Sequence, residues 1–233
     1  WWVLEKSGSA LIMGTVLISA AMPRLLCALL GGALADRWPR LQVLFYADLL
    51  RGLLVGLMAL LAWLDALALW HLYGISVIFE LVDALFPSAY RAVVPEITPS
   101  EALPSANSLT SLSSEVSGIV GPALGASLVA LGGTTFAFAL DALSFLVAAS
   151  CLLPILKLAA APHDEEEEST IWADVRQGLA TVLAQPWLWI TIAVAGVSNL
   201  ALAGPLGVAL PFLVKGHLQA DVQVLGLCFS CES

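Results

Sequence analysis

Charged residues are scarce in this sequence. Only 12% of the 233 residues are Asp, Glu, Lys or Arg, whereas 60% are hydrophobic and the mean hydropathy is +0.93. A soluble domain of this size carries about 25% charged residues. The composition therefore excludes an ordinary soluble protein and places the chain in a lipid bilayer.

Basic residues are the scarcer of the two charge types. Nine Lys and Arg stand against eighteen Asp and Glu, which gives a formal charge of -9, and five of the acids form the run 164–168. Nucleic acids bind proteins through basic surfaces. We therefore expect no nucleic-acid partner.

The sequence has only four cysteines and lacks a phosphate-binding loop. It therefore gives no sign of a metal centre or a nucleotide site. Cys27 and Cys151 lie inside apolar runs, where a thiol acts as a small hydrophobic group. Cys228 and Cys231 have the spacing of a metal-binding pair, but no second pair or histidine cluster accompanies them. The loop GxxxxGK[ST] is absent, which excludes ATP hydrolysis by that route. We expect no metal, no cofactor and no enzymatic activity.

Long apolar runs stand in place of the missing charge. A transmembrane helix needs about 20 mostly apolar residues, and lipid leaves the backbone of a single segment no other way to satisfy its hydrogen bonds. Six runs qualify: 9–35, 41–64, 67–90, 102–131, 134–156 and 187–214. The sequence thus predicts an all-α polytopic membrane protein.

Basic residues also predict which loops face the cytoplasm, because Lys and Arg in short loops are retained on that side. One set of loops holds five of them, and the opposite set holds two. The first set is Arg37, Arg40, Arg91, Lys157 and Arg176, and the second is Lys6 and Lys215. The first set is therefore predicted to be cytoplasmic, and the turns at 65 and 132–133 to lie outside, in a multi-pass protein of the cytoplasmic (inner) membrane.

Three parts follow from these runs. Residues 1–156 form an N-terminal transmembrane half, 157–172 an acidic cytoplasmic linker, and 173–233 the start of a second half. The linker contains AAAPHDEEEEST, a charged segment that we do not expect to pack, and residues 171–185 have one apolar face, as an interfacial helix would. Because the chain opens at Trp1 and stops inside a new apolar run, we expect it to be a fragment.

A polar loop between the first two runs, GGALADRWPR at 31–40, carries the first informative motif. It resembles the loop signature G-x-L-a-D-R-x-G-R-R of the major facilitator superfamily through Gly32, Asp36, Arg37 and Arg40, with Pro39 where the family usually has Gly. In that family the Asp and its arginines form a charge latch against the opposite half of the protein. A tight polar turn with basic anchors is the alternative interpretation.

A second match lies in the fourth run, at SGIVGPALGA, residues 117–126. Gly121, Pro122 and Gly125 fit the antiporter motif of the same superfamily. Small residues let another helix approach, and the proline bends its own helix. An ordinary small-residue packing face is the alternative.

The segments 86–109 and 138–145 resemble bacterial drug and siderophore exporters of the macrolide-efflux and enterobactin-exporter type. The resemblance implies an incomplete major facilitator fold: the end of helix 1, helices 2–7 and the start of helix 8. It also implies a monomeric secondary transporter that exports small amphipathic molecules in exchange for protons.

Ionisable residues inside apolar runs are candidate functional groups, because charge in hydrocarbon is costly unless it is paired or hydrated. The candidates are Arg24, Glu80, Asp83, Glu115 and Asp141. Glu80 and Asp83 share a helix face, where protonation of one carboxylate would relieve the repulsion between them. These two residues and Glu115 are the first candidates for proton or substrate sites.

Buried arginines need carboxylate partners. Glu115 and Asp141 are the predicted partners of Arg24, in an ion pair that serves either structure or function. Asp48 and Arg51, three residues apart nearer the cytoplasmic end of their run, are predicted either to neutralise each other or to extend their charged ends towards the membrane surface.

The predicted function is therefore secondary active export, with protons, a small molecule and membrane lipids as the partners. Two alternatives stay open: a truncated membrane scaffold that transports nothing, and a transporter of lysolipids or other metabolites from the same family. A membrane-embedded enzyme is disfavoured because no pair of nucleophile and base stands out.

Overall fold

The computed structural model describes residues 2–35, 38–158, 182–218 and 221–232, and within these ranges the chain is helical, with no β-strand. The predicted all-α class is confirmed. The predicted linker beyond residue 158, most of the predicted interfacial helix, and the motif residues Asp36 and Arg37 lie outside the described residues. The helices are α1 (Trp2–Ser7), α2 (Ala10–Ala35), α3 (Arg40–Trp63), α4 (Leu69–Asp83), α5 (Phe86–Ile97), α6 (Leu103–Leu158), α8 (Pro186–Gly204), α9 (Leu210–Phe212) and α10 (Val222–Glu232).

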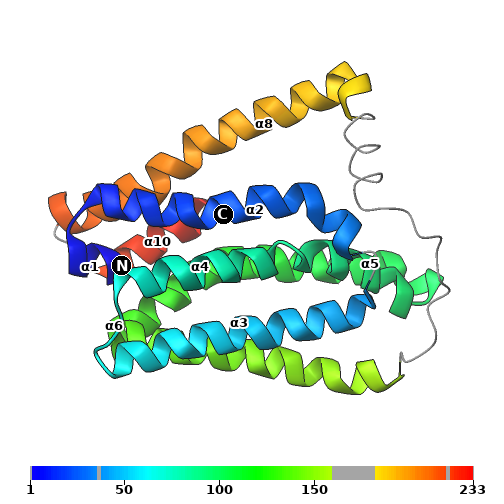
Figure 1. Cartoon of the computed structure of the whole chain (residues 1–233), viewed down its shortest axis with the longest axis horizontal. Helices are drawn as coiled ribbons and strands as arrows, with labels where there is room; N and C mark the ends of the chain where they lie inside the picture. Colours follow the sequence, from blue (N-terminus) through cyan, green and yellow to red (C-terminus); the bar gives the residue numbers. More distant parts are fainter. Residues whose placement is uncertain (1, 36–37, 159–181, 219–220, 233) are drawn as a thin grey trace.

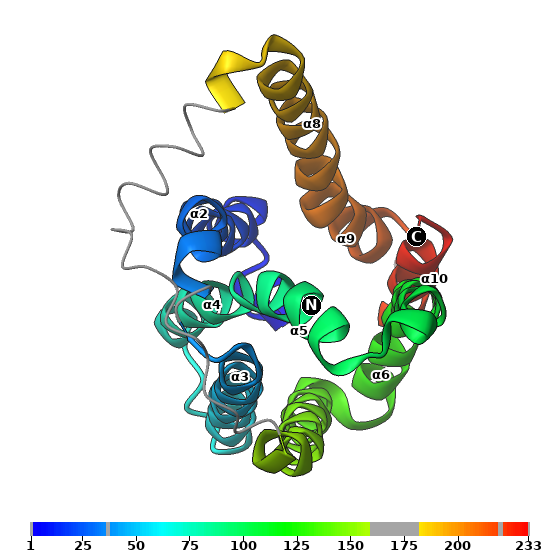
Figure 2. The same cartoon turned by 90° about the vertical axis from the view of Figure 1, so that its right-hand side faces the viewer.

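The long helices run back and forth along one common direction (Figure 1). Viewed from the end, they form an open arrangement in which α3 packs against α6, α2 against α4, and α10 against another part of α6 (Figure 2). Three described helical segments are long and apolar enough to cross a membrane: Arg40–Trp63, Leu69–Ile97 and Ser100–Leu156.

The longest of these segments contains two of the predicted runs. At Gly133 the backbone has φ 75° and ψ 177°, a left-handed conformation that glycine adopts without a steric penalty. The chain reverses there, so the two arms of α6 appear as separate rods in the end view (Figure 2). The predicted turn at 132–133 and the predicted runs on either side of it are confirmed.

The third predicted run, 67–90, is helical, but the helical segment extends beyond residue 90 and its pattern of hydrogen bonds is interrupted. It consists of α4 and α5, separated at Ala84 and Leu85, and the helical segment continues to Ile97. Pro87 accounts for the break, because proline has no N–H to donate to the carbonyl four residues earlier, that of Asp83. At the break the chain forms a tighter turn, in which the Leu85 N–H donates to the carbonyl three residues earlier, that of Val82, at 3.2 Å.

Glycines bring α3 close to the second arm of α6. A Cβ atom on Gly52 would lie 3.1 Å from Cδ2 of Leu146, and one on Gly56 would lie 3.7 Å from Cβ of Ala142. Residues four apart share a helix face, so the two glycines form one small-residue strip of the kind that lets membrane helices approach.

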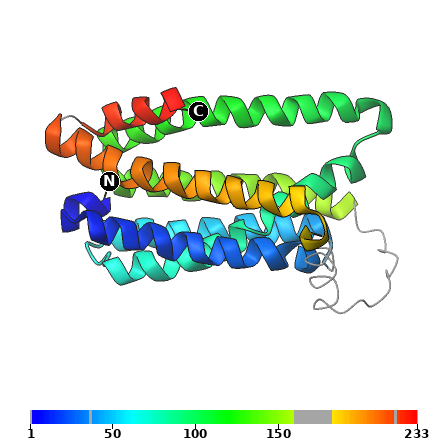
Figure 3. The ribbon, with the colours of Figure 1, turned by 90° about the horizontal axis from the view of Figure 1, so that it is seen from above.

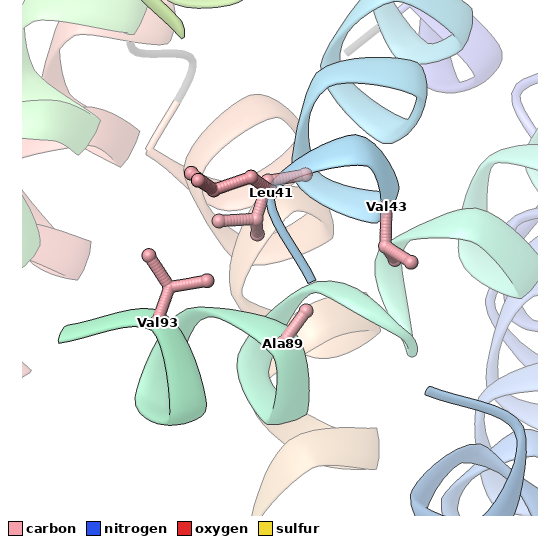
Figure 4. Close-up of a cluster of buried hydrophobic side chains, with 5 residues drawn as sticks. Leu41, Val43, Ala89 and Val93 are labelled. Carbon is pink, nitrogen blue, oxygen red and sulfur yellow. The ribbon is translucent and has the colours of Figure 1, made fainter. Parts of the chain in front are cut away.

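Two clusters of buried apolar side chains hold α3 against its neighbours. Near the Arg40 end, Leu41, Val43 and Leu44 pack against Ala89 and Val93 of α5 (Figure 4). Towards the Trp63 end, a second cluster joins α3 to α4 through Met58, Leu72 and Ile75.

The last predicted run, 187–214, is helical but irregular. Regular turns of α8 give way to π-helical turns at Pro205–Ala209 and Leu213–His217, on either side of α9. Seen from above, α8 runs lengthwise along the bundle and α10 lies along the first arm of α6 (Figure 3).

Candidate functional site

Arg51 lies at the centre of a charge cluster inside the bundle. Its Nη2 donates to Oδ1 of Asp48 at 2.5 Å, its Nη1 donates to Oδ1 of Asp83 at 2.8 Å, and its Nε donates to the carbonyl of Ala47 at 3.4 Å. Arg51 and Asp48 are each only 5% exposed. The predicted pairing of Asp48 with Arg51 is confirmed, and Asp83 joins it from α4.

Two aromatic rings complete the surroundings of the guanidinium. Its central carbon lies 4.2 Å from the ring centroid of Phe86 and 5.0 Å from that of Phe145. A cation within about 6 Å of a ring face is attracted by the ring's negative face. Arg51 therefore links α3 to the end of α4, the start of α5 and the second arm of α6.

The cluster lies deep in the helices that form it. Arg51 stands midway along the 24 residues of α3, and Asp83 stands midway along the 29-residue segment Leu69–Ile97. Asp48 lies about one turn closer to the Arg40 end of α3. Half the length of α3 corresponds to about 18 Å of helix, roughly half of a bilayer's thickness.

The two carboxylates of the cluster differ in exposure. The side chain of Asp83 is 28% exposed, whereas that of Asp48 is 7% exposed. Asp83 is also the last residue of α4, directly before the break that separates α4 from α5. Of the two, Asp83 is the carboxylate that the described residues enclose less completely.

Glu80 lies one turn before Asp83 on α4 and is half-buried. The sequence predicted that these two acids act together on one helix face. The structure joins Asp83 to α3 through Arg51, and the joint role of the two acids stays a prediction. Sequence spacing revealed the pairs within each helix, but it held no signal for which helix faces α4.

The other candidate residues lie apart from this cluster or outside the description. Glu115 and Asp141 are both exposed, in the first and second arms of α6. The side chain of Arg24 falls outside the described residues, so its pairing with Glu115 or Asp141 stays a prediction.

Of the two arginines in the loop motif before α3, the structure describes only Arg40. Nη1 of Arg40 lies 3.9 Å from Oε2 of Glu96, and this pair joins the start of α3 to the end of α5. Both side chains are about one-third exposed. The roles of Gly32, Asp36 and Arg37 stay predictions because their side chains are outside the described part of the chain.

The second motif, residues 117–126 of α6, was expected to let another helix approach at its glycines, but α10 approaches at other residues of the motif. A Cβ on Gly121 or Gly125 would meet no described atom within 4 Å, so these glycines are not where another described helix approaches. The close approach involves the neighbouring positions: a Cβ on Gly226 of α10 would lie 2.4 Å from Cβ of Ala126 and 2.7 Å from the carbonyl oxygen of Pro122. The glycine required for this contact is on α10.

Comparison with known proteins agrees with this arrangement of apolar helices. Residues 1–231 match the transmembrane secretion effector family. The chain belongs to this family of major facilitator transporters. Its members are transporters and not enzymes, so the chain is a multi-pass membrane protein of a transport family.

Several curated relatives are bacterial transporters at about one-quarter identity. They include the uncharacterized transporter YfiS of Bacillus subtilis (26% over 186 residues, 79% of this chain and 43% of the relative) and the enterobactin exporter EntS of Escherichia coli (26% over 197 residues, 84% and 46%). Macrolide efflux protein A of Streptococcus pyogenes is 25% identical over 148 residues, 64% of this chain and 36% of the relative.

The chain spans about half the length of the relatives it matches, or less. No solved structure gives a significant match to it.

Proposed function

We propose that this protein exports small amphipathic molecules across the cytoplasmic membrane in exchange for protons, by alternating access. Residues 1–156 would form the first half of the transporter, 157–172 a cytoplasmic linker, and 173–233 the start of the second half. Two relatives bear the names of exporters, for macrolides and for enterobactin, and these names support export as the direction.

The cluster of Asp48, Arg51 and Asp83 is the observation that carries the proton-coupling proposal. Two carboxylates share one guanidinium in the middle of the bundle. When Asp83 takes up a proton, Asp48 and Arg51 remain as a neutral pair, and the electrostatic hold of α3 on the end of α4 is released. Protonation of Asp83 thereby changes which helices are held together. A coupling site in an antiporter must link proton binding to such a change in conformation.

Asp83 is the proposed proton site because of its exposure and its position. Asp48 is almost wholly buried and shares α3 with Arg51, so its pairing involves no movement between helices. Asp83 is more exposed and comes from a different helix, next to a break in that helix. Broken helices near the middle of the membrane form binding sites in many transporters.

The remaining candidates have secondary places in this proposal. Glu80 and Glu115 are further candidate sites for protons or substrate, since both are ionisable groups within predicted spans. Arg40 belongs to the proposed charge latch, together with Gly32, Asp36 and Arg37.

Efflux of ethidium from cells that produce the protein tests the proposal. We expect efflux in energised cells that a protonophore abolishes, and we expect Asp83→Asn to remove it. Asp65→Asn is the matched control, because the same chemical change falls in the exposed turn between α3 and α4, at φ 52°, a conformation that Asn also tolerates. Efflux that resists the protonophore, or that survives Asp83→Asn at the parental rate, would rule out this coupling site.

A further inference from the structure

We propose that α5 is a lever that transmits the protonation state of Asp83 to the loop before α3. This inference rests on the proposed proton site at Asp83, and it adds a mechanical path from that site to the loop motif. The path consists of contacts at both ends of α5 and along its length.

The first end of α5 touches the charge cluster. Phe86, the first residue of α5, holds its ring 4.2 Å from the guanidinium carbon of Arg51, which also binds Asp83 at 2.8 Å. The ring of Phe86 is stacked on that of Tyr90, one turn further on, with centroids 5.8 Å apart. A shift of the Arg51 side chain therefore reaches α5 directly.

The other end of α5 touches the start of α3. Glu96 lies 3.9 Å from Arg40, the last residue of the loop motif GGALADRWPR. The pair is partly exposed and therefore weak, so a small displacement of α5 is enough to separate it.

Between these ends, α5 packs against α3 through its two buried residues, Ala89 and Val93. Ala89 is 1% exposed and Val93 is 4% exposed, and both belong to the buried cluster that contains Leu41, Val43 and Leu44 of α3. Closely packed interiors transmit a displacement instead of absorbing it. With twelve residues, α5 is about 18 Å long, and this length extends from the charge cluster around Arg51 to the loop before α3.

The break before α5 frees the lever from α4. Ala84 and Leu85 lie outside both helices, and Pro87 denies the Asp83 carbonyl its usual helical donor. α4 packs against α2 and the Trp63 half of α3, whereas α5 packs near the Arg40 end of α3, so the break is the proposed hinge for a tilt of α5 relative to α4.

Several charged groups surround Asp83 on the elements packed against it. Asp48 and Arg51 face it from α3, and Glu80 precedes it on α4. The charged residues of α5, Arg91 and Glu96, lie towards its far end, and Arg24 is the one charged residue in the sequence of α2, its side chain being outside the described part. Protonation of Asp83 removes one attraction to Arg51, and the guanidinium then settles between Asp48 and the rings that belong to α5 and α6.

Labelling of the loop tests the lever without a transport assay. In a cysteine-free version of the chain held in lipid nanodiscs, Trp38→Cys places a reporter at an exposed loop position, and the rate of maleimide labelling is measured at constant pH. Asp83→Asn mimics the protonated acid. We expect it to change the labelling rate about two- to fivefold, the range that a partly exposed ion pair can supply.

Two further variants identify α5 as the path. Glu96→Gln, which removes the charge contact at the far end, should abolish the response to Asp83→Asn. Glu101→Gln is the matched control, because it neutralises an exposed acid just beyond α5 and should leave the response intact. Should Asp83→Asn fail to fold, the mobility of a nitroxide at position 38, followed in the otherwise unchanged protein as the pH is lowered, gives the same reading.

The lever is overturned if position 38 does not respond to Asp83→Asn, or if the response is the same with Glu96→Gln present. The proposed function is judged separately by ethidium efflux. A loop that responds in a protein whose efflux ignores Asp83→Asn would retain the lever and reject the coupling site, whereas lost efflux with an unresponsive loop would do the opposite.

Discussion

At the scale of single residues, Arg51 has the most consequential position in the described part of the chain. It satisfies Asp48 and Asp83 and lies against two aromatic rings, and both Arg51 and Asp48 are almost wholly buried. A buried ion pair adds little stability relative to apolar residues of the same shape, but removal of one partner leaves a charge without compensation. Stability should therefore respond to single changes far more than to paired ones.

We expect Arg51→Leu to lower the free energy of unfolding by about 3–5 kcal/mol, because Asp48 is left buried and charged. The double variant Asp48→Asn with Arg51→Leu should recover part of that loss. Arg91→Leu, at an exposed position, is the control and should change little. Unfolding titrations in mild detergent measure all three. A single variant no less stable than the double one would contradict this view of the cluster.

The sequence predicted part of this site. Asp48 and Arg51 pair as their spacing of three residues on a helix indicates. Asp83 was singled out as an ionisable residue in an apolar run, but its bond to Arg51 depends on how α3 and α4 lie against each other. Glu96 was not expected as the partner of Arg40, since exposed charges near loops have many possible partners.

At the scale of helices, small residues determine which pairs approach closely. A Cβ on Gly52 would stand 3.1 to 3.2 Å from Leu146 and Phe145, whereas one on Gly56 would meet only ordinary contact at 3.7 Å. The two glycines are one turn apart on α3 and face the same arm of α6. They form a matched pair for a test of this interface.

We expect Gly52→Val to destabilise the protein by about 1–3 kcal/mol, the usual cost of overpacking, because α3 and α6 must separate. Gly56→Ala should cost less than half of that amount, since its new methyl group fits. Thermal unfolding of both variants in the same detergent provides the comparison. Equal losses would show that the two helices do not meet as closely at Gly52 as the structure has them.

The break between α4 and α5 explains why helix boundaries were harder to predict than helices. Counting apolar residues joined 67–90 into one run, because the count registers side chains and not backbone hydrogen bonds. Pro87 carried the signal for the break, as the carbonyl of Asp83 loses its donor. The same count ended the run before Arg91, because it stops at charged residues. The helix nevertheless continues to Ile97, since the part of a helix outside the apolar layer can carry charge.

At the scale of the whole molecule, α10 and the π-helical segment Pro205–Ala209 rest on the earlier helices through glycines. Gly226 fits against Pro122 and Ala126 of α6, and a Cβ on Gly207 would lie 3.1 Å from Cδ1 of Leu17 on α2. Composition and hydropathy predicted the all-α class of the protein. These pairings between distant segments could not be predicted, because any small residue on any helix offers a similar surface.

We expect Gly226→Leu to move α10 away from α6, since no side chain fits in the space that Gly226 occupies. Spin labels at the exposed positions Leu109 of α6 and Leu227 of α10 report the change as a longer distance between them. Gly74→Leu is the control, because a Cβ there meets no described atom within 4 Å. An unchanged distance in the Gly226 variant would mean that α10 is not seated on Pro122 and Ala126 in the membrane.

The most direct test of the account is ethidium movement in proteoliposomes that contain the purified protein. With the unchanged protein, an imposed proton gradient should drive ethidium across the membrane, and a protonophore should stop it. Asp83→Asn should abolish this driven movement while exchange of ethidium between the two sides, without a gradient, continues. An Asp83→Asn protein that still moves ethidium with the gradient, or an unchanged protein that moves none, would contradict the assignment of Asp83 as the site where protons drive export.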